Sequence, residues 1–115
     1  MEHVLAAYPS SSFGLIDSTD DDTITQFFGF GASNCSSYEQ LTADTFTAGL
    51  TDIRTQLAAY PNFGEYIFSG TRHTTLESSA DLDSQTVPAA ADAGTVALTD
   101  WISGLIAGHA TSAGP

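Results

Sequence analysis

Two short apolar runs on either side of a long helical pattern constrain the fold of this chain most strongly. The runs are Phe13–Asp17 (FGLID) and Glu65–Phe68 (EYIF), and each is mostly apolar on both faces. Strands of that kind are typical of parallel sheets, which are covered on both sides. Because a helical pattern lies between the runs, we expect a βαβ unit with a right-handed crossover.

The helix between the two runs has the clearest pattern in the sequence, and we predict it over 43–60. Its apolar stripe recurs at four-three-four spacing and consists of Phe46, Leu50, Ile53 and Leu57. Asp44 is the expected N-cap, and Pro61 follows the last turn. Three further helices are predicted: one that ends before Pro9, one over 22–28 that ends at Gly29 and Gly31, and one over 96–107 with a stripe of Leu98, Trp101, Ile102, Leu105 and Ile106.

The number of predicted strands limits the folds that these elements can form. A sheet that is stable by itself usually needs three or more strands, and only two are predicted here. We therefore assign the chain to the α/β class and predict a single partial domain over residues 1–115, the C-terminal part of a larger α/β domain with an incomplete parallel sheet. The segment 76–94 is expected to be a long loop, and the tail 108–115 is expected to fray.

The composition narrows the possible partners. The chain has 115 residues, a formal net charge of −12 and only two basic side chains, Arg54 and Arg72. Nucleic acid and anionic membrane surfaces are therefore unexpected partners, because both attract basic patches. An apolar content of 42% argues against disorder. The N-terminus does not resemble a signal peptide, so either the protein is cytosolic or any signal belongs to a longer precursor.

The single cysteine, Cys35, excludes an internal disulfide and a zinc site of the Cys/His type. It is either a thiol with a partner elsewhere or a small buried thiol.

Polar side chains follow both predicted strands. Asp17–Asp22 (DSTDDD) comes after the first strand, and Ser69–Leu76 (SGTRHTTL) comes after the second. Functional residues gather beyond the carboxyl ends of parallel strands, so an acid of the first cluster and His73 of the second should face each other. Such an acid would fix the tautomer of the imidazole, which could then take a proton from a nucleophile.

The nucleophile itself is not identifiable. No G-x-S-x-G pattern occurs, and Ser10–Ser12 precede a strand rather than follow one. An acidic turn before a helix is also a common cap, and a single histidine after a strand is often structural.

Three segments resemble a known family: FGLIDSTDDDTITQFFGFG, the stretch FTAGLTDIRTQLAAYPNFGEYIFSGTRHTTL, and VALTDWISGLIAG. They are similar to the C-terminal third of secreted, pectin acetylesterase-like serine esterases of the α/β-hydrolase fold. The resemblance implies that S-T-x-D-x-x-I carries the triad acid at Asp21, with Asp22 as the alternative, and that G-x-x-H-T-x-L carries the triad histidine at His73. It implies no metal or organic cofactor, and an extracellular or periplasmic location.

Two functions follow as hypotheses. In the first, the chain supplies the acid and histidine of a serine carboxylic-ester hydrolase, which acts on a small or polymeric ester, and the serine lies on a missing N-terminal segment. In the second, the chain is a small acidic interaction module or an inactive remnant that docks through open strand edges, with a homodimer as one outcome.

Overall fold

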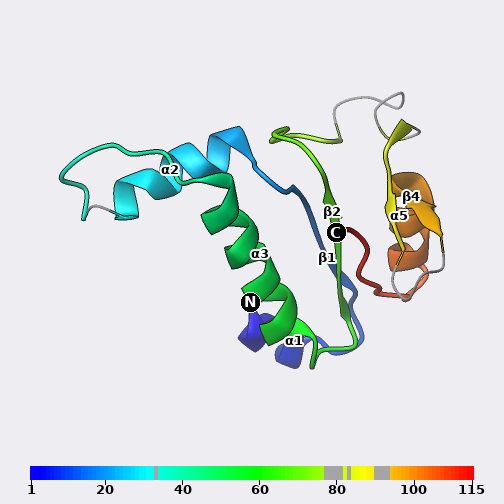
Figure 1. Cartoon of the computed structure of the whole chain (residues 1–115). Coiled ribbons are helices and arrows are strands. Elements are labelled where there is room, and N and C mark those ends of the chain that lie inside the picture. The colour runs from blue at the N-terminus through cyan, green and yellow to red at the C-terminus, as the bar shows by residue number, and fades with distance from the viewer. Residues whose placement is uncertain (33, 77–81, 83, 90–93) are drawn as a thin grey trace.

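The computed structural model describes residues 1–32, 34–76, 82, 84–89 and 94–115, and Figure 1 shows how its elements are arranged. The described elements, in chain order, are α1 Glu2–Ala7, β1 Phe13–Ser18, α2 Asp22–Ala32, α3 Ala43–Leu57, β2 Phe63–Phe68, β3 Thr86–Pro88, β4 Thr95–Ala97 and α5 Leu98–Ile106. The chain is therefore a mixed α/β protein with a two-stranded parallel sheet, which agrees with the predicted α/β class.

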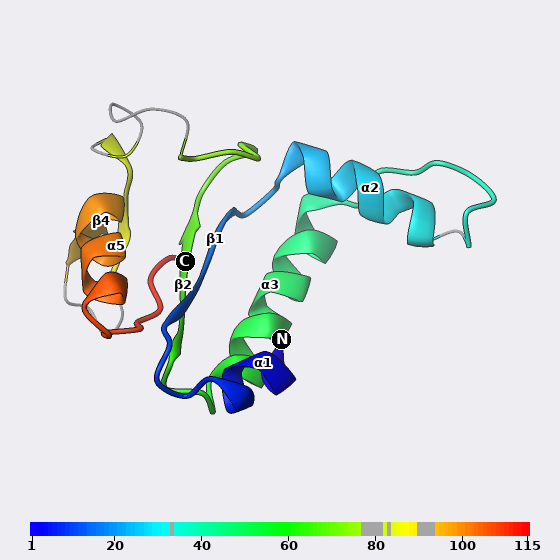
Figure 2. The same cartoon turned by 180° about the vertical axis from the view of Figure 1, so that it is seen from behind.

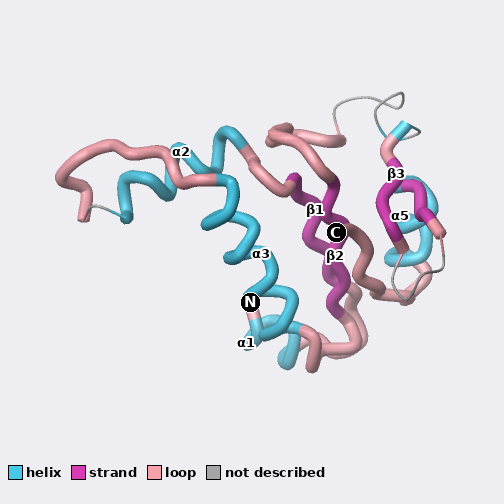
Figure 3. Tube along the Cα trace, in the orientation of Figure 1, coloured by secondary structure: helices cyan, strands magenta, loops and turns pink. Residues whose placement is uncertain are grey.

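Strands β1 and β2 form the predicted parallel pair. Phe13 lies opposite Phe63, and Ser18 lies opposite Phe68, so the two strands are in step from end to end. Helices α2 and α3 lie between them in the chain and make the crossover, as the strand and helix colours of Figure 3 show. Both strands are longer than their apolar runs, because the flanking residues also join the ladder.

Helices cover both faces of this sheet. Figures 1 and 2 show α3 on one side and α5 on the other. Because side chains alternate along a strand, β2 contributes to two cores. Ile67 packs with Phe46 and Leu50 of α3. Tyr66 and Phe68 pack with a cluster on the α5 side that includes Leu98, Trp101, Val87 and Ala113. All six residues of β2 are buried as a result.

The C-terminal tail closes the second edge of β2, which corrects the expectation that 108–115 fray. Ala113 donates its N–H to the Glu65 carbonyl (2.8 Å) and accepts from the Ile67 N–H (2.9 Å). Trp101 donates from Nε1 to the Thr111 carbonyl at 2.7 Å. Two main-chain hydrogen bonds and one from the Trp101 side chain hold the tail, and the main-chain bonds depend on no apolar pattern that the sequence could display.

Near the end of the tail, an ion pair joins helix α3 to the sheet. Glu65 is fully buried in β2 and is paired with Arg54 of α3. Arg54 also donates from Nη1 to the Pro115 carbonyl at 3.1 Å. One of the two basic side chains therefore serves the fold, because it compensates a buried carboxylate.

The predicted loop over 76–94 is partly wrong. Within the residues that the structure describes, Thr86–Pro88 forms β3, which pairs antiparallel with β4 at Thr95–Ala97. Part of the loop prediction lies outside the described residues. Val96 belongs to β4, so the last helix begins at Leu98 rather than at Val96.

Other helix boundaries also differ. Helix α2 continues through Gly29 and Gly31 to Ala32, since glycine weakens a helix interior without ending it. A Cβ at Gly29 would lie 1.7 Å from the Glu39 carbonyl oxygen, so this glycine permits the loop to return against the helix. Helix α3 ends at Leu57, and its N-cap is Thr42, not Asp44.

Three side chains lie in more exposed settings than their patterns suggest. Ile53 of α3 is 39% exposed and Ile106 of α5 is 82% exposed, so neither completes its predicted stripe. Cys35 is free and exposed, which excludes the buried alternative.

Gly64 offers a test of the tail contact. A Cβ there would lie 2.4 Å from the Thr111 carbonyl oxygen, a backbone atom that no side-chain rotation can move. Gly64→Ala is expected to lower the free energy of unfolding by about 1–3 kcal/mol and to speed hydrogen exchange at the Ile67 amide. Gly49→Ala is the control, because no atom lies within 4 Å of its Cβ position. Unchanged exchange at Ile67 in Gly64→Ala would contradict the tail placement.

Candidate functional site

The loops that follow β1 and β2 are hydrogen-bonded to each other at the carboxyl end of the sheet. Thr19 donates its N–H to the Phe68 carbonyl (2.9 Å), Asp20 to the Gly70 carbonyl (3.0 Å), and Asp22 to the Thr71 carbonyl (3.1 Å). The Gly70 N–H returns a bond to Thr19 Oγ1 at 3.2 Å. Gly70 has a φ of 133°, which favours glycine and lets the second loop turn at this point. These hydrogen bonds continue the pairing of β1 and β2 into the loops, and they hold the acidic loop beside the loop that carries His73.

Asp21 uses its two carboxylate oxygens for different purposes. Oδ1 accepts the N–H of Thr23 (2.9 Å) and of Ile24 (2.7 Å), which is the N-cap arrangement for α2. Oδ2 faces His73 Nδ1 at 2.8 Å. The residue is 1% exposed. Capping explains why an acid begins this helix, but it leaves the second oxygen available for the histidine.

These contacts stabilise the negatively charged form of Asp21. Burial alone would raise the pKa of the Asp21 carboxyl, but the hydrogen bonds from Ile24 and His73 outweigh it, so the pKa lies below its ordinary value. The start of α2 also favours an anion, because the helix dipole is positive there. Asp21 is therefore a carboxylate at neutral pH.

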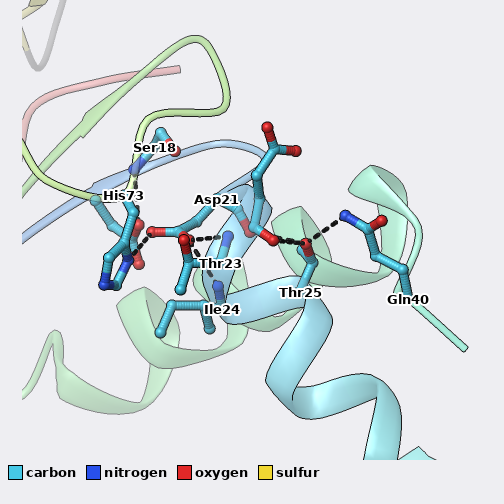
Figure 4. A network of polar contacts seen from close by, with 9 residues as sticks. Ser18, Asp21, Thr23, Ile24, Thr25, Gln40 and His73 are labelled. Carbon is cyan, nitrogen blue, oxygen red and sulfur yellow. Dashed lines mark hydrogen bonds and ion pairs between the residues drawn. The ribbon is translucent and has the colours of Figure 1, made fainter. Parts of the chain in front are cut away.

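His73 lies between this carboxylate and solvent. Its Nδ1 faces Asp21, while 43% of its side chain is exposed. Figure 4 shows the ring beside Asp21, with Thr23 and Ile24 on the capping side of the carboxylate. In the neutral imidazole, a carboxylate that accepts from Nδ1–H leaves Nε2 without a proton and directed away from the carboxylate. The predicted proximity of Asp21 and His73 is confirmed, and a catalytic role for the pair stays a prediction.

Asp22, the alternative acid, is placed differently. It is the first residue of α2 and is exposed. The contact recorded for His73 is with Asp21, so the structure favours Asp21 over Asp22 as the partner of the histidine.

Asp17, which the sequence analysis placed in the acidic cluster after the first strand, lies within β1 in the structure. Its Oδ1 accepts the Ser18 N–H at 2.8 Å. Burial raises the pKa of Asp17 to about 6, and the charge of Asp21 adds to the effect.

Among the described residues, the serines next to the two ends of β1 are not placed to act as the nucleophile. Ser10–Ser12 precede β1, at the end of the sheet opposite to His73. Ser18 lies at the carboxyl end of β1, but it is fully buried, and its hydroxyl has no hydrogen-bond partner in the structure.

Within the described residues, no group of three or more His, Cys, Asp or Glu side chains is arranged to hold a metal ion. None of the described helices is long and apolar enough to span a membrane. Comparisons of the chain with protein-family models, with curated proteins and with solved structures found no match.

Proposed function

We propose that this chain is the acid-and-histidine portion of a serine carboxylic-ester hydrolase with the α/β-hydrolase fold, as the resemblance to secreted pectin acetylesterase-like enzymes implies. The observation that carries the proposal is the 2.8 Å contact between Asp21 Oδ2 and His73 Nδ1 beyond the ends of two adjacent parallel strands. The proposed setting is extracellular or periplasmic, and the proposed substrate is a small or polymeric ester.

The geometry supports the proton transfers that ester hydrolysis requires. Nε2 of His73 would take the proton of a serine hydroxyl as its oxygen attacks the ester carbonyl carbon. The resulting imidazolium would be stabilised by the Asp21 carboxylate and would then protonate the departing alcohol. Water would repeat the sequence on the acyl-serine, which releases the acid and restores the serine. The backbone hydrogen bonds between the two loops keep the histidine and the acid in position during both acylation and deacylation of the serine.

The serine of this proposal lies outside the 115 residues, on a segment that precedes them. The test is to extend the reading frame upstream of Met1, express the longer protein and treat it with a fluorophosphonate probe. Labelling of a glycine-flanked serine that weakens in His73→Ala would support the proposal. A longer protein whose labelling is independent of His73, or a frame that begins at Met1, would contradict it.

The edge of β1 supports a second candidate function, an interaction module. Among the described residues, the far edge of β1 carries no paired strand, whereas both edges of β2 are taken. Beside β1 lies a mostly apolar pocket of about 480 Å³, lined by Met1, Glu2, His3, Leu15, Ile53, Gln56, Leu57 and Phe63. An unpaired edge next to apolar surface is a common site of strand addition.

The isolated chain is therefore expected to self-associate. Sedimentation velocity at increasing concentration should show a dimer or larger species, because an open parallel edge and exposed apolar side chains favour association. A compact monomer at all concentrations, with a cooperative thermal transition, would contradict this expectation.

A further inference from the structure

The acidic loop holds the backbone of Gly70 at both its N–H and its carbonyl. The Gly70 N–H donates to Thr19 Oγ1 at 3.2 Å, and the Gly70 carbonyl accepts the Asp20 N–H at 3.0 Å. Gly70 has a φ of 133°, and glycine has more conformational freedom than any other residue. Because His73 follows in the same loop, the direction in which that loop leaves β2 depends on these two hydrogen bonds.

Thr19 connects three parts of the fold. Its N–H donates to the Phe68 carbonyl (2.9 Å), its Oγ1 accepts from Gly70, and its carbonyl accepts the hydroxyl of Thr47 in α3 at 2.8 Å. Thr19 directly follows β1 and stands just before the segment that carries Asp21. The acidic loop, the histidine loop and the helix that covers the sheet are therefore linked through this residue.

The hydroxyl of Thr19 is the part of this link that depends on the residue type. The bonds of its N–H and carbonyl belong to the backbone and would form with almost any residue. The Gly70 N–H needs an oxygen on the side chain that it faces, which threonine and serine carry and valine lacks. Threonine holds this oxygen more firmly than serine does, because its β-branched side chain has a restricted χ1.

The bond between Thr19 and Gly70 affects position more than stability. Thr19 is partly buried and Gly70 is exposed, so water can bind the Gly70 N–H when the hydroxyl is removed. A hydrogen bond that water can replace contributes little to folding, since its loss leaves no buried group without a partner. Its loss does release the start of the histidine loop. The expected consequence is a displaced His73 in a chain that still folds.

We propose that Thr19 is a positioning residue for the candidate site: its hydroxyl accepts the Gly70 N–H and so holds the histidine loop where His73 Nδ1 meets Asp21. The effect of Thr19 on ester hydrolysis rests on the proposed function, whereas its effect on the contact between His73 and Asp21 does not. Thr19 acts through His73 and not on a reacting atom.

The first test is NMR spectroscopy of the whole 115-residue chain and three variants. Thr19→Val removes the acceptor at nearly constant shape, and Thr19→Ser keeps it. Thr51→Val is the matched control, because the Thr51 hydroxyl donates to the Thr47 carbonyl within α3.

In Thr19→Val, we expect the Gly70 amide to exchange with solvent about 2- to 10-fold faster. We also expect the downfield signal of the His73 Nδ1–H, which reports its hydrogen bond to Asp21, to broaden or move upfield. Both readouts should stay at their wild-type values in Thr19→Ser and Thr51→Val. The urea midpoint of Thr19→Val should stay close to that of Thr51→Val, which a merely structural role for the Thr19 hydroxyl would not allow. Thr19→Ala, which also removes the acceptor, takes the place of Thr19→Val if the valine prevents folding.

The second test is steady-state kinetics of the complete esterase, the longer protein that includes the serine. Thr19→Val is expected to lower kcat by about 10- to 100-fold with little change in KM, since a displaced base impairs the chemical step and not substrate binding. Thr19→Ser should restore most of the activity.

The outcomes separate this inference from the proposed function. An unchanged Gly70 exchange rate or an unchanged His73 signal in Thr19→Val would overturn the inference and leave the esterase proposal standing. Wild-type kcat in Thr19→Val, or a Thr19→Ser variant as impaired as Thr19→Val, would overturn it as well. Conversely, a displaced His73 signal in a protein whose hydrolysis ignores His73 would support the positioning of the pair and refute the esterase.

Discussion

Asp21→Asn is expected to lower the kcat of the complete esterase, the longer protein that includes the serine, by about 10,000-fold. The asparagine carbonyl can still accept the N–H groups of Thr23 and Ile24, so the cap on α2 survives. Its NH₂ would instead donate to His73 Nδ1, which leaves the proton on Nε2. A protonated Nε2 cannot accept the proton of a serine, so the loss falls on the chemical step.

Steady-state hydrolysis of a short-chain p-nitrophenyl ester measures this effect, and three further variants serve as comparisons. His73→Ala should lower kcat by several orders of magnitude, because it removes the base itself. Asp20→Asn should have a mild effect. Asp21→Ala should lower the free energy of unfolding by about 0.5–2 kcal/mol through loss of the cap, whereas Asp21→Asn should not. Near-normal turnover in Asp21→Asn would show that Asp21 is only a cap.

Trp101→Ala is expected to lower the free energy of unfolding by about 3–5 kcal/mol, since it opens a cavity in the core between α5 and the sheet. Trp101 is 3% exposed, and its ring centroid lies 5.7 Å from that of Tyr66. It also donates to the Thr111 carbonyl, so the variant leaves that acceptor without its partner. Domains of this size are stable by about 5–15 kcal/mol, so much of the folded population could be lost.

Urea unfolding followed by circular dichroism measures this change, since the variant has no tryptophan to report by fluorescence. Ile106→Ala is the matched control on the same helix, because Ile106 is 82% exposed, and its effect should stay within about 0.5 kcal/mol. Trp101→Phe keeps an aromatic ring and loses only the N–H donor, so its cost should lie between the two. A loss below about 1 kcal/mol in Trp101→Ala would contradict the packing of α5 on the sheet.

The pairing of the two strands was predictable because the signal is local. Each apolar run is short, both faces of each are apolar, and a helical stripe separates them. Those features require a parallel ladder with a helical crossover, and the loops after β1 and β2 must then meet at one edge. The proximity of Asp21 and His73 followed from that placement, although the two residues are 52 positions apart in the chain.

Asp17 could not be assigned in the same way. In the sequence it stands both at the end of the apolar run and at the start of the acidic cluster, and its ionisation depends on what buries it. Only the packed structure partly buries its carboxyl, which raises its pKa to about 6, and gives Asp21 two backbone N–H donors and the histidine. Burial and hydrogen bonding are tertiary properties, so the different environments of Asp17 and Asp21 have no counterpart in the sequence pattern.

The sequence by itself determined the mixed α/β class, the parallel βαβ unit and the acid–histidine meeting, because periodicity and chain order are sufficient for these. Only the tertiary structure decided that the tail closes the edge of β2 through Ala113, that Thr86–Pro88 and Thr95–Ala97 form a second small sheet, and that Thr42 rather than Asp44 caps α3. The cap rests on the side chain of Thr42, whose Oγ1 accepts the Thr45 N–H. The other two features rest on backbone hydrogen bonds between segments of small and polar residues. Such bonds form wherever packing brings the backbones together, and they require no particular side chains.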